Sequence, residues 1–342
     1  MKTIVSCLFF LLGFLLSACK KEQSVIVSSE QTVYILNEGN FQIGNTSLSV
    51  FDPKTNSVSN DVFYQTNHFQ LGDVGQSMLP VDSTLFVVLN NSSKITVLNS
   101  NQAFQKKYDI TIPGGSPRFM QIVGNQKAYV TELYANKIWI ADLNNKIISG
   151  SIAVSGWTEQ LYPLDGKVFV AQRQKPGGPK AAALLVLDPG SNTINKTISL
   201  NSDPTGLAVD EKEHRLYICC EAVSGNAVIY QLNTSSASIV DSILLPAIPN
   251  PRFLDINANG DLFFASGSVY RILKNSKSIQ QFVEGHGNEW YGLNVNKSNG
   301  DVYVSDAIDY VQASHIFRYD STGKLLTSFT AGINSNGFVF KQ

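Results

Sequence analysis

The chain has 342 residues, of which 43% are hydrophobic and 15% are charged, and its formal net charge at pH 7 is −1. This length and apolar content are sufficient for a large hydrophobic core. The absence of a basic excess argues against nucleic acid or an anionic membrane surface as the partner.

The first residues are typical of a targeting segment rather than of a folded domain. Lys2 supplies a positive charge, residues 7–16 form an apolar run too short to cross a bilayer, and residues 16–19 read L-S-A-C. The last four resemble a bacterial lipobox, which implies a lipoprotein signal peptide over residues 1–18 and a lipid on Cys19. Residues 19–30 are then a lipidated tether. The alternative is an ordinary secretory signal in which Cys19 is incidental.

One pattern recurs along the rest of the chain, and its clearest copy spans residues 204–245. Four short runs rich in β-branched and aromatic residues alternate there with Gly, Asp, Asn or Ser, which predicts four antiparallel strands joined by tight turns. A single meander of this kind leaves both faces and both edges exposed, so it needs neighbours. An aromatic residue in the second run marks each copy: Tyr34, Phe86, Tyr129, Phe169, Tyr217, Phe263 and Tyr303.

These markers lie 40 to 52 residues apart, which is the period of radial arrays of four-stranded sheets. The sequence therefore predicts an all-β fold, a seven-bladed β-propeller of four-stranded antiparallel blades over residues 31–342. Six copies have a first run: 76–81, 118–123, 159–164, 205–210, 252–257 and 291–296. The copy that begins at Val33 has none. We expect residues 337–340, G-F-V-F, to complete the first blade and close the ring.

Cys219 and Cys220 are the two cysteines beyond the leader, and they are adjacent on a predicted strand. Neighbouring strand residues point to opposite faces. We therefore expect two buried, free thiols rather than a disulfide framework.

One rim of the predicted propeller gathers aromatic residues and arginines. The loop between the second and third strands of each blade and the connection into the next blade should emerge on the same rim, where ligand sites are common. The candidate ligand-binding residues there are Asn40, Phe41, Gln76, Arg118, Tyr134, Trp157, Arg173, Arg252, Trp290, Tyr291 and Tyr310. Aromatic faces suit a macrocycle or a catechol ring, and guanidinium groups suit phosphate, carboxylate or metal-chelate oxygens. The alternative for each residue is packing between blades or capping of a loop.

The motif N-E-G-N-F at 37–41, S-L-S at 47–49 and D-A-I-D-Y-V-Q at 306–312 resemble those of the YncE-like, YVTN-type propeller lipoproteins of Gram-negative outer membranes. These proteins are also similar to the β chain of quinoprotein amine dehydrogenase. The resemblance covers nearly all of the mature chain. It implies a lipid-anchored protein of the outer membrane, facing the cell exterior or the periplasm. Such a protein captures a corrinoid such as cobalamin, or a ferric siderophore, and passes it to a TonB-dependent transporter.

Catalysis is the weaker expectation. The sequence contains no H-E-x-x-H, G-x-S-x-G or P-loop motif, and we expect no catalytic residues, no cofactor and no resident metal. A calcium-dependent, lactonase-like hydrolase is an alternative, with conceivable ligands Asn37, Glu38, Glu132, Glu159 and Asp306. A protein-binding scaffold is another. The insertion K-P-G-G-P-K at 175–180 is a flap, a partner surface or an ordinary variable loop.

Overall fold

A computed structural model describes residues 32–178, 181–223 and 226–341. The predicted signal peptide, the lipidated Cys19 and the tether lie outside these residues. Within the described ranges, no helix has both the length and the apolar character needed to span a membrane.

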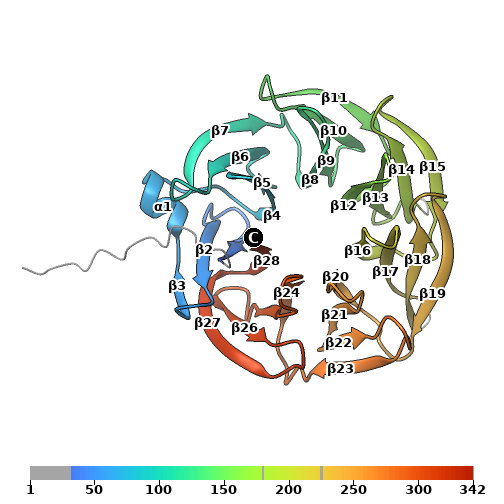
Figure 1. Cartoon of the computed structure of the whole chain (residues 1–342). Helices are drawn as coiled ribbons and strands as arrows, with labels where there is room; N and C mark the ends of the chain where they lie inside the picture. Colours follow the sequence, from blue (N-terminus) through green and yellow to red (C-terminus); the bar gives the residue numbers. More distant parts are fainter. Residues whose placement is uncertain (1–31, 179–180, 224–225, 342) are drawn as a thin grey trace, which may run out of the picture.

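Seven four-stranded antiparallel sheets stand in a ring (Figure 1), which confirms the predicted all-β, seven-bladed propeller. From the inner to the outer strand, the first three blades are β28 (Ser335–Phe340), β1 (Val33–Asn37), β2 (Ser47–Asp52), β3 (Ser57–Ser59); β4 (Gly75–Val81), β5 (Thr84–Leu89), β6 (Lys94–Asn99), β7 (Gln105–Thr111); and β8 (Pro117–Gly124), β9 (Lys127–Glu132), β10 (Lys137–Asp142), β11 (Ile147–Ala153).

The fourth and fifth blades are β12 (Trp157–Leu164), β13 (Lys167–Arg173), β14 (Ala183–Asp188), β15 (Thr193–Ser199); and β16 (Pro204–Asp210), β17 (Arg215–Val223), β18 (Asn226–Asn233), β19 (Ser238–Leu245). The sixth and seventh are β20 (Arg252–Ile256), β21 (Leu262–Ser266), β22 (Ser268–Ile272), β23 (Ile279–Val283); and β24 (Trp290–Val295), β25 (Val302–Asp306), β26 (Ala313–Tyr319), β27 (Leu325–Ile333). The meander over 204–245 is thus the complete fifth blade.

The ring closes between the two ends of the described chain, as the sequence predicts. β28 is the inner strand of the first blade and pairs antiparallel with β1, with Val33 opposite Phe340 and Ile35 opposite Phe338. Because β1 has no inner partner of its own at the start of the chain, β28 supplies the missing ladder and removes an open edge. The first blade is therefore assembled from segments about 300 residues apart.

The hydrophobic core lies between the blades. Second and third strands are covered on both faces by neighbouring blades, so strands such as β5 are nearly continuously apolar and buried. Fourth strands lie at the perimeter, and β15 accordingly has no fully buried residue: Ile194 and Ile198 are half-buried and the others are exposed. The two cysteines follow this arrangement: both are free and buried, with Cys219 packed in the cluster towards the sixth blade and Cys220 in the cluster towards the fourth. The prediction of two buried, free thiols is confirmed.

One element was not predicted. After the short strand β3, the chain forms the helix α1 (Val62–Asn67), whose Val62 and Phe63 are buried against the core shared by the first two blades. The ring of Phe69 packs edge-on against Phe63, with ring centroids 5.4 Å apart. The helix therefore covers apolar surface that a full-length fourth strand covers in the other blades.

Candidate ligand-binding site

The predicted rim exists in the structure. In five blades, a backbone hydrogen bond joins the end of the second strand to the segment that leads into the inner strand. In four of them the donor directly follows the second strand: Glu38 to Asn334, Asn90 to Val74, Leu133 to Ser116 and Ala307 to Glu289. In the fifth blade the donor is Glu221, near the end of β17, and the acceptor is Asp203. Their N···O distances are 2.8 to 3.1 Å. The two kinds of loop therefore share one face of the propeller, which we call the mouth.

A cavity of about 640 Å³ occupies the hub at this mouth, and the inner strands of all seven blades contribute to its wall. Figure 1 shows these inner strands arranged around the centre of the ring. Seven of the eleven predicted residues line the cavity: Gln76, Arg118, Arg173, Arg252, Trp290, Tyr291 and Tyr310. The other four, Asn40, Phe41, Tyr134 and Trp157, do not line it.

Glu38 and Tyr291 form the centre of a polar cluster on the hub wall. The Tyr291 hydroxyl donates to a Glu38 carboxylate oxygen at 2.9 Å, and the Asn336 side-chain amide donates to the same oxygen at 3.1 Å. Burial raises the pKa of Glu38, although these hydrogen bonds and the Arg118 charge oppose the rise. The Asn336 side-chain oxygen is buried and has no hydrogen-bond partner among the described residues. The cluster therefore contains a buried, unpaired acceptor beside a weakly acidic carboxyl group.

Arg118 is already committed to protein partners. Its Nε donates to Glu159 at 2.9 Å, a second nitrogen donates to the other Glu159 oxygen at 3.2 Å, and Gln76 accepts a further hydrogen bond. A forked pair of this kind fixes the guanidinium and neutralises it. Arg118 is thus less available to an anionic ligand than its place on the rim suggests.

The other two arginines of the mouth are less constrained. Arg173 faces Asp203 at 3.7 Å and Glu221 at 4.0 Å, distances that are too long for hydrogen bonds. Arg252 is exposed and has no ion-pair partner among the residues that the structure describes.

The aromatic residues of the mouth divide into structural and accessible ones. The Trp290 indole N–H donates to the Gly267 carbonyl at 2.8 Å, and its ring packs edge-on against Phe317. Tyr310 is 45% exposed and lies edge-on to Tyr291, with ring centroids 5.7 Å apart. Tyr310 therefore presents the more accessible aromatic ring to the hub.

The loop that carries Tyr310 is held in an uncommon conformation. Ile308 and Tyr310 have φ values of 60° and 64°, which are unfavourable for such side chains. Asn40 donates from its side chain to the Tyr310 carbonyl at 2.7 Å, so Asn40 positions the loop rather than lining the cavity. Phe41 and Tyr134 are 64% and 63% exposed and stand outside the hub. Backbone strain that the surroundings maintain is common at binding sites.

Sequence reasoning missed the polar floor of the cavity. Asp255, from β20, accepts hydrogen bonds from the Val295 backbone at 2.9 Å and the Asn294 side chain at 3.1 Å. Burial raises the pKa of Asp255, and burial together with the Asp255 charge raises the pKa of Tyr162. The sequence did contain a signal for this polar floor, because the first run of each repeat, which forms the inner strand, carries polar residues at positions that would point to the hub.

The five conceivable calcium ligands do not converge. Glu132 is buried and accepts hydrogen bonds from the Ser116 backbone, the Tyr134 backbone and the Trp139 indole. Asn37 bonds groups of the neighbouring strands β2 and β27, and Asp306 accepts hydrogen bonds from Asn288 and Glu289 in a loop. Within the described residues, no group of three or more His, Cys, Asp or Glu side chains could hold a metal ion.

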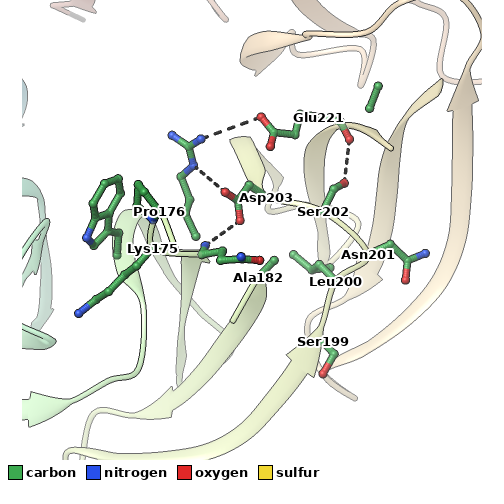
Figure 2. A pocket seen from close by; sticks show the side chains of 13 residues that line it. Lys175, Pro176, Ala182, Ser199, Leu200, Asn201, Ser202, Asp203 and Glu221 are labelled. Atoms are coloured by element: carbon green, nitrogen blue, oxygen red, sulfur yellow. Dashed lines mark hydrogen bonds and ion pairs between the residues drawn. The ribbon is translucent and has the colours of Figure 1, made fainter. Parts of the chain in front are cut away.

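A second pocket of about 560 Å³ opens between the fourth and fifth blades. Trp157 lines this pocket instead of the hub, and Arg173 and Glu221 line both cavities. In Figure 2, Lys175 and Pro176 stand on one side, Leu200 and Asn201 on the other, and Asp203 lies between them. The insertion at 175–180 thus contributes to a pocket wall through its described part. The fifth blade contributes Glu221 and Ala222, from β17, to that wall.

Comparison with solved structures supports the fold. A quinonprotein alcohol dehydrogenase-like protein from Bacteroides thetaiotaomicron superposes with a TM-score of 0.71 at 13% identity, over 92% of this chain and 79% of that one. A protein from Lactobacillus plantarum superposes with a TM-score of 0.70 at 10% identity, over 92% of this chain and 100% of that one. Apo AztD from Citrobacter koseri superposes with a TM-score of 0.56 at 11% identity, over 90% of this chain and 82% of that one. At these identities the likeness concerns the fold alone.

Sequence comparisons place the chain in a family without fixing an activity. No curated protein matches it. A family model described as a domain of unknown function, DUF5074, matches residues 31–340, which include all seven blades. The chain therefore belongs to the DUF5074 family.

Proposed function

We propose that this protein captures a large organic or metal-chelate ligand in the hub cavity of its mouth. The observation that carries the proposal is the cavity itself: about 640 Å³, walled by all seven inner strands and lined by aromatic, amide and charged side chains. Pockets for small molecules typically have volumes of roughly 300 to 1,000 Å³ and a few convergent polar groups. A ligand larger than the cavity would extend over the mouth.

The charges of the hub favour an uncharged cargo. Glu159 neutralises Arg118, and the carboxylates of Asp203 and Glu221 face Arg173. A polyanionic ligand would have to displace these carboxylates, whereas a neutral ligand rich in amides could use the amide and hydroxyl groups of the wall. Of the two cargoes that the sequence resemblance implies, we therefore favour a corrinoid such as cobalamin over an anionic ferric siderophore.

Location and partner belong to the same proposal. β1 runs from Val33 towards the mouth, where Glu38 follows it, so the chain enters the propeller from the opposite face. If Cys19 carries a lipid in the outer membrane, the mouth would then point away from the membrane surface. The proposal that the cargo is handed to a TonB-dependent transporter rests on the sequence resemblance.

The two alternatives are supported less well. For a calcium-dependent hydrolase, the candidate ligands are dispersed, and Glu132, Asn37 and Asp306 each serve neighbouring backbone or side-chain groups. For a protein-binding scaffold, the exposed Phe41, Ile43 and Val311 on the mouth loops are the relevant feature. Calcium-dependent ester or lactone hydrolysis, or recovery of a membrane protein without small ligand, would favour one of these instead.

The test is retention of a coloured cargo. The chain lacking residues 1–19 is mixed with cyanocobalamin or with a ferric catecholate, desalted and examined for bound colour. We expect cyanocobalamin to be retained, and Tyr310→Ala to weaken its binding about tenfold through loss of an aromatic contact. Phe41→Ala, outside the cavity, is the matched control and should bind normally. Loss of both colours on desalting would contradict the proposal.

A further inference from the structure

We propose that the pocket between the fourth and fifth blades is a second binding site, for a planar, uncharged heterocycle that has a carbonyl group beside an N–H. We call it the side pocket; its lining includes Trp157, Arg173, Lys175, Asp203 and Glu221. The inference goes beyond cargo capture in the hub and does not depend on which cargo the hub takes. It is carried by three features: an aromatic wall, an uncommitted guanidinium and a balanced charge.

Trp157 provides the aromatic wall. It begins β12, lies opposite Arg173 in the strand register, and packs edge-on against Tyr134 with ring centroids 5.8 Å apart. The indole N–H groups of Trp139 and Trp290 each donate to a protein acceptor at 2.8 Å. The Trp157 indole has no such acceptor among the described residues. A ring in the pocket would therefore meet an apolar face and an unused donor.

Arg173 provides the uncommitted guanidinium. Its Nε is buried without a hydrogen-bond partner among the described residues, and the carboxylate oxygens of Asp203 and Glu221 lie 3.7 and 4.0 Å from its nitrogens. Arg118 is the contrasting case on the same mouth, because Glu159 and Gln76 hold it by short hydrogen bonds. Leaving a buried donor unpaired costs free energy, so this guanidinium is held less firmly than that of Arg118 and can turn towards a ligand carbonyl oxygen.

Two carboxylates, those of Asp203 and Glu221, lie beside the Arg173 guanidinium and can accept hydrogen bonds from a ligand. The Gln174 backbone N–H donates to Asp203 at 2.7 Å and fixes it. The Glu221 side chain, in contrast, is 41% exposed, and its carboxylate lies as far as 4.0 Å from the nearest Arg173 nitrogen. A carboxylate at that distance is weakly held by Arg173 and can turn towards a ligand N–H. An edge with adjacent carbonyl and N–H groups would match Arg173 and Glu221 together.

The charge of the pocket explains why the ligand should be neutral. Two cations, Arg173 and Lys175, and two carboxylates, Asp203 and Glu221, line the pocket. The Lys175 ammonium donates to the Asn136 side-chain oxygen. Either sign of ligand charge would leave an uncompensated charge between the blades, which is costly where water is displaced. An uncharged heterocycle of the flavin, pteridine or purine-base type meets the requirement.

The probes are riboflavin, lumazine and guanosine, which all have such an edge. Each is titrated into the full chain in detergent solution, with riboflavin followed by quenching of its fluorescence. We expect at least one probe to bind, and Trp157→Leu and Arg173→Met each to weaken that binding about tenfold. Tyr310→Ala, in the hub, should leave it unchanged. For riboflavin, methylation of the ring N3–H should weaken binding about fivefold by removing the donor.

The outcomes separate the side pocket from the hub. Thermal melting checks that each variant is folded, and Arg173→Lys, which keeps the charge, serves as a milder second variant. Binding of none of the probes, or binding that survives both Trp157→Leu and Arg173→Met, would overturn the inference. Binding lost only in Tyr310→Ala would assign the probe to the hub and overturn it as well. If a heterocycle binds as expected and no corrinoid or siderophore does, the side pocket stands and the proposed cargo fails.

Discussion

The Tyr291 phenol, in β24, donates a hydrogen bond of 2.9 Å to the carboxylate of Glu38, which follows β1. The two residues are 253 positions apart in the sequence, and their contact bridges the junction that β28 closes. Asn336, from β28 itself, donates to the same carboxylate oxygen. One wall of the hub is thus built from both ends of the propeller, so the lining of the hub and the closure of the ring share side chains.

The protonation of Glu38 should make stability depend on pH. Burial raises its pKa above the ordinary value of 4.5. A carboxyl group whose pKa is raised by folding favours the folded state at pH values below its unfolded pKa, and that contribution is lost as pH rises through the folded pKa. We therefore predict that Glu38→Gln gains free energy of unfolding relative to the unchanged protein as pH rises from about 4 to about 7.

Urea unfolding of both proteins at the two pH values measures this effect. Glu284→Gln, which changes an exposed carboxylate, is the control and should track the unchanged protein. Parallel pH profiles for Glu38→Gln and the unchanged protein would contradict the prediction.

Glu132 should prove structural rather than metal-binding. Its buried carboxylate accepts hydrogen bonds from the backbone of Ser116 and Tyr134 and from the Trp139 indole, at 2.8 to 3.0 Å. Glu132→Ala leaves these donors unpaired, and we expect it to lower the free energy of unfolding by about 3 kcal/mol or more. Chemical denaturation measures the loss. A calcium chelator should not reproduce it in the unchanged protein, and a matching loss on chelation would favour a metal role.

The fold was accessible from the sequence because each blade repeats the same local pattern. The aromatic residue of the second strand, exemplified by Tyr129 and Tyr217, recurs at a period that only a few architectures share. The missing first run before Val33 then pointed to the C-terminal strand. The helix α1 escaped prediction because six residues after a turn give too little periodicity to be recognised.

The site was accessible only in part. Topology placed Arg118 and Arg173 correctly at the mouth. It could not show that Glu159, 41 residues away, binds Arg118, or that the Arg173 Nε has no hydrogen-bond partner among the described residues. Such pairings depend on the distance between blades, which local sequence does not encode. The side pocket was missed for the same reason, since Trp157 and Asp203 meet across two sheets.

Two equivalent tyrosines should respond in opposite directions to loss of their hydroxyl groups. Tyr129 and Tyr303 are both fully buried in second strands. The Tyr129 hydroxyl donates to Asn192 at 2.7 Å, whereas the Tyr303 hydroxyl has no partner among the described residues. We expect Tyr303→Phe to raise the free energy of unfolding by about 1 kcal/mol and Tyr129→Phe to lower it by about 1 kcal/mol. Urea denaturation of the two variants side by side measures both changes, and equal losses would contradict the assignment.

Deletion of residues 337–342 tests whether the C-terminal strand closes the ring. The deletion removes most of the ladder between β28 and β1 and the buried ring of Phe338, which packs 5.8 Å from the ring of Tyr303. It also reopens the first blade, whose apolar core would then face water. We expect a severe fall in melting temperature.

A point variant separates packing from strand loss at the same junction. Phe338→Ala keeps the backbone ladder and should cost about 3 to 5 kcal/mol, the usual range for a buried Phe. Phe41→Ala, whose ring is exposed on a mouth loop, should cost little. If the truncated protein melted normally, the ladder to β1 would not hold the ring. If Phe338→Ala alone matched the deletion, side-chain packing rather than strand pairing would account for closure.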